Sequence, residues 1–232
     1  MLTIENLTIS YNKKDNILHD LNLQLGKGQI EGLVGINGSG KTTLLKAISG
    51  EVNFYHGSIQ WNGSLISFKD VAMLETSNYF YQYLTGKEYL QIFQAYHTKF
   101  DIEGINQVFQ LPLHQLIESY STGMKKKLAF MAILSLDRPL LILDEPFNGL
   151  DIEGTFAFKK LMQILKDKGK TILVTSHIFE TLTTICDQIH YLSDKKIVKT
   201  YPKPAFEDLQ RDILHVLDTQ NEQAWEGIKN VI

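Results

Sequence analysis

The sequence has little of what marks secreted, membrane-spanning or nucleic-acid-binding chains. A single cysteine, Cys186, stands among 232 residues. No disulfide can therefore form within the chain, which suits a reducing cytosol. No stretch approaches the ~20 apolar residues that a membrane-spanning helix needs, and residues 1–10 have a strand pattern rather than that of a signal peptide. The net charge of −3 and the isoelectric point near 6.2 argue against a nucleic-acid partner.

Biased segments are scarce as well. There is no low-complexity segment and no run of coiled-coil heptads, and the one notable basic run is Lys125-Lys126-Lys127, which we expect to be a solvated helix face. Cys186 lies in a helical pattern and is expected to be a small buried hydrophobe. With 44% hydrophobic residues, the length suits one large domain or one domain with an inserted lobe.

The sequence does contain a phosphate-binding loop. Residues 35–42 read GINGSGKT and fit the pattern G-x-x-x-x-G-K-[ST] at every fixed position. An apolar run at 30–34 precedes the loop and a helical pattern at 41–48 follows it, which is the strand–loop–helix context that the motif requires. The glycines let successive backbone N–H groups point at a phosphate. A second loop of this kind is absent from the sequence, so two such sites in tandem are excluded.

Each side chain of this loop has an expected task. Lys41 is expected to reach the β- and γ-phosphates as a point charge, and the Thr42 hydroxyl to bind Mg²⁺, which prefers oxygen ligands. The helix that starts near Lys41 adds free N–H groups and the positive end of its dipole. The expected nucleotide-binding residues here are Gly35, Asn37, Gly38, Ser39, Gly40, Lys41, Thr42 and Thr43, although Thr43 by itself favours packing.

Two further apolar runs end in side chains suited to phosphate chemistry. Residues 140–146 read LLILDEP, the pattern of a buried parallel strand whose carboxyl end opens into a site. Asp144 is expected to hold Mg²⁺, and Glu145 to polarise an attacking water as general base. The run at 171–176 ends at His177, which is placed to contact a γ-phosphate. The alternatives are a strand that simply ends in an acidic turn, and a surface or core histidine.

Together these residues resemble the ATP-binding cassette (ABC) ATPases over nearly all of residues 1–200. The deciding element is YSTGM at 120–124, which resembles the family signature, usually LSGGQ. Ser121 and Gly123 match it, and the family places them against the γ-phosphate bound by the other protomer. Ser121 also has the pattern of a helix N-cap. Three letters depart from the commonest form, at Tyr120, Thr122 and Met124.

The resemblance assigns roles to further residues. Asp151, after Asn148-Gly149-Leu150, matches the D-loop and would act across the dimer, and His177 matches the switch histidine. Tyr11 stands where the family places an aromatic on adenine, a contact worth ~1–3 kcal/mol in nucleic-acid systems; the alternative is an ordinary sheet surface. Glu75 stands where the family usually has the Q-loop glutamine, and it would reach Mg²⁺ or the attacking water.

The implied fold is an α/β P-loop NTPase of the ABC type, with a mixed or parallel sheet core, an N-terminal antiparallel β-subdomain and an inserted helical lobe. We expect one ATPase domain over 1–200, in which 1–75 and 138–200 form the nucleotide-binding core and 76–137 the lobe, followed by a C-terminal extension at 201–232. Local signals mark a helix end at Gly50, a hairpin turn at Asn62-Gly63, a capping box at Thr85-Gly86-Lys87-Glu88, N-caps at Asp101 and Ser121, and a helix over 205–217.

The resemblance further implies a cytoplasmic ATP-binding subunit on the inner face of the cell membrane, bound to a separate membrane-spanning subunit. Two copies, or this chain and a paralogue, would close around two ATP molecules. The segment at 84–90, LTGKEYL, resembles exporter-type cassettes and favours export. The tyrosines at 79–83 belong to the region that receives the membrane partner. The alternatives are an importer ATPase, a soluble ABC ATPase of a protein assembly, a small-molecule P-loop kinase, and GTP as the nucleotide.

Overall fold

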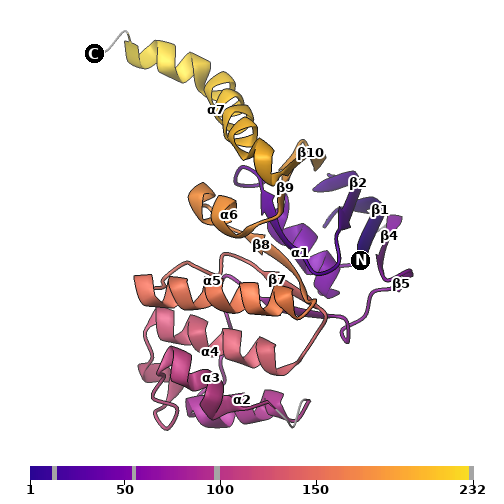
Figure 1. The fold of residues 1–232 in the computed structure, drawn as a ribbon. Coiled ribbons are helices and arrows are strands. Elements are labelled where there is room, and N and C mark those ends of the chain that lie inside the picture. Colours follow the sequence, from indigo (N-terminus) through magenta and orange to yellow (C-terminus); the bar gives the residue numbers. More distant parts are fainter. Residues whose placement is uncertain (12–14, 54–55, 97–99, 230–232) are drawn as a thin grey trace.

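Two β-sheets organise the chain, with helices packed between and beside them (Figure 1). A computed structural model describes residues 1–11, 15–53, 56–96 and 100–229. The four-stranded sheet has the order β2-β1-β4-β5, and the six-stranded sheet has the order β10-β9-β3-β8-β7-β6. These are the antiparallel subdomain and the mostly parallel core that the sequence predicts for an ABC-type P-loop fold.

The smaller sheet is antiparallel throughout. It contains β1 (Leu2–Ile9), β2 (Leu18–Leu25), β4 (His56–Trp61) and β5 (Ser64–Leu65). Asn62 and Gly63 join the last two strands with φ values of 50° and 82°. Two positive φ angles are what a two-residue hairpin turn of this type requires, so the predicted turn is confirmed.

The larger sheet carries the nucleotide-binding motifs. Its parallel strands are β6 (Val71–Leu74), β7 (Leu140–Leu143), β8 (Thr171–Thr175), β3 (Ile30–Val34) and β9 (Gln188–Ser193), and β10 (Lys196–Pro202) pairs antiparallel with β9. The central strands are buried on both faces, which explains why they are continuous apolar runs in the sequence.

The helices follow the predicted signals. They are α1 (Lys41–Ser49), α2 (Gly86–Gln94), α3 (Ile102–Phe109), α4 (Thr122–Ser135), α5 (Ile152–Asp167), α6 (Phe179–Ile185) and α7 (Phe206–Lys229), with short 3₁₀ turns at Ile117–Ser119 and Lys203–Ala205. The predicted caps are confirmed at Gly50, Thr85 with Glu88, Asp101 and Ser121.

The two faces of the large sheet bury different layers. Leu33, Ile142 and Leu173 face α1 and the antiparallel sheet, whereas Leu143 and Val174 face the helical lobe and α5. On the lobe side, three rings join α3, α4 and α5: Phe109 lies 6.3 Å from Phe130 and 5.6 Å from Phe158, and the last two rings stack at 4.3 Å. This three-phenylalanine cluster fixes the lobe to α5. The free thiol of Cys186 is buried, as expected.

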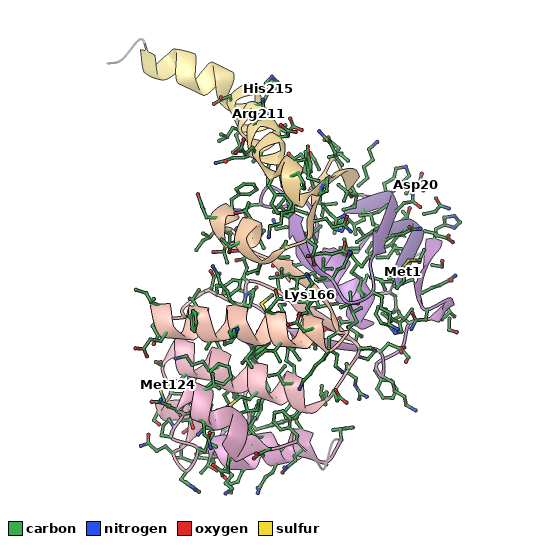
Figure 2. The ribbon with its side chains drawn as sticks, viewed as in Figure 1. Met1, Asp20, Met124, Lys166, Arg211 and His215 are labelled. Atoms are coloured by element: carbon green, nitrogen blue, oxygen red, sulfur yellow. The ribbon has the colours of Figure 1, made fainter. Side chains whose placement is uncertain are left out.

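Helix α7 leaves the body of the molecule and ends far from it (Figure 1). Its first turns are anchored, because Phe206 and Leu209 are buried. Arg211 and His215, labelled in Figure 2, lie where the helix leaves the other elements. The sequence predicts its start well but its end too early, since the helix continues to Lys229.

The expectation that Lys125-Lys126-Lys127 forms a solvated face is wrong. Lys126 is only 4% exposed, and the Lys127 ammonium lies 3.3 Å from Asp151 Oδ1. Helix α4 contacts α2, α3 and β6, and its side chains from Leu128 to Ile133 are all buried. A helix enclosed in this way has no wide polar face, so even its lysines lie among other elements.

A buried carboxylate–imidazole contact joins two neighbouring strands of the large sheet, away from the phosphate loop. Glu31 of β3 is fully buried and its Oε2 lies 2.6 Å from Nε2 of His190, which is 2% exposed on β9. The same carboxylate accepts hydrogen bonds from the Gln188 side chain and the Gly26 amide, while His190 Nδ1 lies 2.8 Å from the Thr200 hydroxyl. Each member of the pair therefore has partners on more than one side.

Candidate functional site

Three neighbouring strands end at one edge of the large sheet. β3, β8 and β7 lie side by side and parallel. The phosphate loop follows β3, His177 follows β8, and Asp144 with Glu145 follows β7. The sequence places all three segments at the carboxyl ends of parallel strands, where ligands bind in open α/β sheets, and the structure confirms that they converge there.

The loop itself is shaped by its glycines. Gly38 and Gly40 have φ angles of 81° and 102°, in the region that favours glycine, and Gly40 is the N-cap residue of α1. At Gly35 a Cβ atom would lie 2.5 Å from the Leu192 carbonyl oxygen and 2.6 Å from Ser39 Oγ. The loop therefore curls tightly around the space in front of α1, where the helix N–H groups are free to bind an anion.

Lys41 lies across the mouth of the loop. Its Nζ donates to the carbonyl oxygens of Gly35, at 2.7 Å, and Ile36, at 3.2 Å. Burial lowers the pKa of this ammonium, and the charges of Glu145 and Asp144 act in the opposite direction. A phosphate oxygen entering the loop would offer the ammonium a charged acceptor in place of neutral carbonyls, which makes a stronger bond.

The Asp144 carboxylate is 5% exposed and is held from two sides. Thr175 of β8 donates its hydroxyl to Oδ1 at 2.7 Å, and Thr76 donates to Oδ2 at 2.9 Å. Thr175 Oγ1 also accepts the Glu145 amide at 2.9 Å. One threonine on β8 thus orients both acidic residues that follow β7.

Glu145 is a buried carboxylate at a left-handed backbone position, with φ 50° and 5% exposure. Its Oε2 accepts the His177 amide at 3.1 Å. Its Oε1 lies 3.2 Å from His177 Nε2 in a geometry that forms no hydrogen bond, and it has no other partner in the described part of the chain. Burial raises the pKa of Glu145, while the His177 contacts and Lys41 lower it and Asp144 raises it.

These groups surround one cavity of about 420 Å³, a size typical of small-molecule sites. Its lining residues are Ile17, Asn37, Gly38, Gly40, Lys41, Thr42, Thr43, Thr76, Asp144, Glu145 and His177. Nine of these eleven are residues that the sequence predicts for the site. Gly35 and Ser39 belong to the same loop without lining the cavity, and Ser39 Oγ is buried with no partner among the residues described.

Two lining residues, Ile17 and Thr76, were missed, and Glu75 is not where the sequence predicts it. Thr76 faces the cavity, whereas the Glu75 carboxylate lies 3.9 Å from Lys46 Nζ and does not line the cavity. Successive residues of an extended segment point to opposite sides, so the neighbour of Glu75 takes the inward position. The available signal was the period of β6, which places Thr76 on the same side as Leu74.

Tyr11 lies at the rim. Its side chain is 62% exposed, and its hydroxyl is 3.4 Å from Thr43 Oγ1 at the start of α1. Thr43 is itself buried, so the packing role that its position favours is confirmed. An exposed ring beside the phosphate-loop helix offers a flat apolar surface, and Tyr11 does not line the cavity itself.

The signature residues lie on a different surface. Ser121 Oγ accepts the Met124 amide at 3.2 Å and caps α4, and Met124, labelled in Figure 2, marks this end of the helix. A Cβ at Gly123 would lie 2.6 Å from the Gly149 carbonyl oxygen, and Asp151 accepts the Gly154 amide as the N-cap of α5. Ser121, Gly123 and Asp151 therefore adjoin one another and do not line the cavity of their own chain.

Comparison with known proteins gives the family. The ABC transporter family model matches residues 18–148. The lantibiotic transport ATP-binding protein SrtF of Streptococcus pyogenes is 30% identical, covering 90% of this chain and 94% of its own length. The bacitracin transport ATP-binding protein BcrA of Enterococcus faecalis is 32% identical, covering 86% of this chain and 68% of its own length.

Solved structures agree. An ATP-binding subunit of an ABC transporter superposes with a TM-score of 0.82 at 27% identity, covering 92% of this chain and 93% of that one. A dimeric ATP-binding cassette bound to ADP and phosphate after hydrolysis shares the fold, with a TM-score of 0.75 at 19% identity over 88% of this chain and 99% of its own. The chain therefore belongs to the ABC transporter family, as an ATP-binding subunit with ATPase activity.

Proposed function

We propose that this chain powers an exporter from the inner face of the cell membrane. The convergence of the phosphate loop, Asp144, Glu145 and His177 on one cavity carries the nucleotide part of the proposal. The LTGKEYL segment at 84–90 and the names of the relatives SrtF and BcrA, which refer to peptide transport, support export. Among the described residues no helix is both long and apolar enough to span a bilayer.

The donor set in the cavity fits Mg²⁺. Thr42 and Asp144 both line it, and a hydroxyl and a carboxylate are the oxygen ligands that this ion prefers. When bound, the metal would neutralise charge on the β- and γ-phosphates. Glu75 would act only after a movement that brings it past its present partner Lys46, so Thr76 is the better placed of the two.

The remaining side chains divide the work of hydrolysis. Lys41 leaves its carbonyl partners to bind the β- and γ-phosphates, and Tyr11 stacks against the base. Glu145 Oε1, buried and without a hydrogen-bond partner among the described groups, accepts the proton of the attacking water. His177, whose side chain is 58% exposed, contacts the γ-phosphate from the end of the neighbouring strand β8 and holds the Glu145 carboxylate through its amide.

The ATP sandwich involves two cassettes. Ser121 and Gly123 contact the γ-phosphate held by the phosphate loop of the other chain, and Asp151 acts beside them. Their place outside their own cavity supports this arrangement, which is isologous when both chains are copies of this one. Closure on ATP and opening after hydrolysis then drive the membrane partner between states.

The acid limb of the pH dependence of kcat/KM for ATP should reflect the raised pKa of the buried Glu145. A general base must be deprotonated, and burial raises its pKa above the ordinary value of about 4.3. As the pH is lowered, kcat/KM for ATP should therefore fall at a higher pH than an ordinary glutamate would cause. Thermal stability measured at each pH separates this fall from acid unfolding. An acid limb at the ordinary glutamate value would contradict the proposed environment of the base.

The loop before α2 is the proposed binding site for the membrane partner. Tyr79, Tyr81 and Tyr83 are 78%, 56% and 76% exposed, and exposed aromatics are common binding anchors. Substituting Tyr81 and Tyr83 by alanine should abolish recovery of a multi-spanning protein when the tagged chain is purified from extracted membranes, while ATP binding is kept. Alanine at the exposed Phe68 is the control. Unchanged recovery would remove these tyrosines from the interface, and recovery of soluble proteins alone would favour a soluble assembly ATPase.

The direction of transport can be tested with membrane vesicles that contain the chain and its membrane partner. Inside-out vesicles expose the cassette to added ATP, so an exporter should accumulate its cargo in them. Bacitracin and a lantibiotic are the first probes, because relatives are named for them. Uptake that occurs only in right-side-out vesicles loaded with ATP would indicate import. The Glu145→Gln variant, which should bind ATP without turnover, controls for adsorption of the peptide.

A further inference from the structure

Lys126 is a buried cation near the nucleotide site that the proposed mechanism does not use. It lies on α4, about one and a half turns after Ser121, and only 4% of it is exposed. Removing an ammonium from water is costly unless its donors are satisfied. Its neighbour Lys125 is half-exposed, so the burial belongs to this position and not to the whole basic run.

The ammonium of Lys126 binds the backbone just after β6. Its Nζ donates to the carbonyl oxygens of Glu75, at 3.0 Å, and Thr76, at 2.8 Å. These are the first residues of the segment that leads from the nucleotide cavity into the helical lobe. Lys126 therefore gives the signature helix a polar link to the start of this segment, in addition to the packing of α4 against β6.

The segment held by Lys126 in turn holds a catalytic-site carboxylate. Thr76 faces the cavity and donates its hydroxyl to Asp144 Oδ2 at 2.9 Å. The path from the signature helix to the nucleotide cavity thus has two polar links, one at the Thr76 carbonyl and one at its hydroxyl. Burial lowers the pKa of Lys126, and the charges of Asp144 and Glu145 raise it, so both carboxylates interact with this cation.

Satisfying two carbonyls does not require a lysine at this place. An amide or hydroxyl side chain would supply neutral donors without burying a charge, whereas the ammonium also adds a positive charge beside two carboxylates. That charge offsets part of the repulsion between Asp144, Glu145 and an incoming triphosphate. The position is therefore better explained by the nucleotide site than by packing of the lobe alone.

We propose that Lys126 is a positioning residue for ATP hydrolysis, which fixes Thr76 and, through it, the Asp144 carboxylate, and so connects the signature helix to the nucleotide site of its own chain. This inference rests on the ATPase activity of the family and on the proposed role of Asp144 at the metal. Lys126 does not line the cavity; it acts through the 75–76 backbone.

Three variants test the link in the full chain, together with its membrane partner where that is available. Lys126→Met keeps the length and removes charge and donors, Lys126→Arg keeps both, and Thr76→Val removes the hydroxyl with little change in shape. Lys168→Met, on the exposed end of α5, is the matched control. Nucleotide affinity, kcat, the Mg²⁺ concentration for half-maximal activity and thermal stability are measured for each.

The expected result separates positioning from stability. Lys126→Met and Thr76→Val should each lower kcat by about 10-fold or more, as loss of orientation commonly does, and raise the Mg²⁺ requirement, while ATP affinity changes by about twofold or less. Lys126→Arg should retain most of the wild-type kcat. Combined, Lys126→Met and Thr76→Val should do no more than the larger single effect, because both break one path. In nucleotide-free protein, the Lys126→Met substitution by itself should accelerate amide hydrogen exchange over 75–78, and the control substitution should not.

Several outcomes would overturn the proposal. A Lys126→Met protein with lower thermal stability but normal kcat and Mg²⁺ dependence in its folded fraction would make the lysine purely structural. If the fold-losses of kcat in the two single variants multiply in the double variant, the two residues act separately. If Lys126→Met fails to fold, a normal kcat in Thr76→Val would still contradict the proposed link from Lys126 through Thr76 to Asp144. Loss of activity in Glu145→Gln together with a fully active Lys126→Met would overturn this inference and leave the proposed ATPase mechanism standing.

Discussion

Replacing Glu145 by glutamine should stop ATP hydrolysis while leaving ATP bound. The amide keeps the shape of the carboxylate but cannot accept a proton, and a positioned general base contributes about 10²–10⁴-fold to rate. The cavity is otherwise unchanged, because Lys41, Thr42 and Asp144 remain in place. We expect the single-turnover rate of ATP hydrolysis to be lower by a factor in that range. Dimers that form when ATP is added should persist, which light scattering measures.

The same substitution should stabilise the fold at neutral pH. Burial raises the folded-state pKa of Glu145, so the stability that the protonated side chain provides is lost as the pH rises through that value. Glutamine is neutral at every pH, and the thermal midpoint of the variant should exceed that of the wild type more at neutral than at acidic pH. Glu153→Gln, at an exposed position of α5, is the control. Normal turnover in Glu145→Gln would show that another group is the base.

Truncating Glu31 to alanine should markedly lower the stability of the fold. It would leave the buried His190 and the half-buried amides of Gln188 and Gly26 without their common acceptor. Breaking a buried pair by removing one partner typically costs about 3–5 kcal/mol, against a total of about 5–15 kcal/mol for a domain. At about 2–4 °C per kcal/mol, the thermal midpoint should fall by roughly 6–20 °C.

Two further variants keep this expectation precise. Glu31→Gln retains the shape and one acceptor oxygen, so its loss should be smaller than that of alanine. Glu5→Ala, on the neighbouring sheet and exposed, should change stability by about 0.5 kcal/mol or less. Denaturant unfolding of all three, without nucleotide, gives the comparison. A loss below about 1 kcal/mol for Glu31→Ala would mean that water or a neighbouring group replaces the carboxylate.

The parts of the site that the sequence predicts correctly are those set by local chemistry. The phosphate loop needs glycines at fixed spacing, and the strand ends carry Asp144, Glu145 and His177 directly after apolar runs. The caps are equally local, because Thr85, Asp101 and Ser121 each bond an amide three residues ahead. Such signals contain their own partners within a few residues, so a single sequence is enough to find them.

The parts that the sequence misses depend on contacts between distant segments. Whether Glu75 or Thr76 faces the cavity depends on how β6 sits against β7, and no fixed spacing follows the strand. Lys126 is read as solvated because lysines usually are, yet its partners are carbonyls 50 and 51 residues away in the chain. Ile17 reaches the cavity from the residue just before β2 of the antiparallel sheet, a placement that depends on how the two sheets pack.

The close contact of the signature turn with the D-loop has a consequence for the choice of partner. Gly123 abuts the Gly149 carbonyl, Lys127 pairs with Asp151, and the three-phenylalanine cluster clamps α4 to α5 behind them. In the proposed ATP sandwich, the two motifs would therefore meet another cassette at a fixed spacing. A paralogue that replaces a second copy of this chain would need a phosphate loop and a D-loop that match this spacing, so the geometry of the whole face would contribute to pairing.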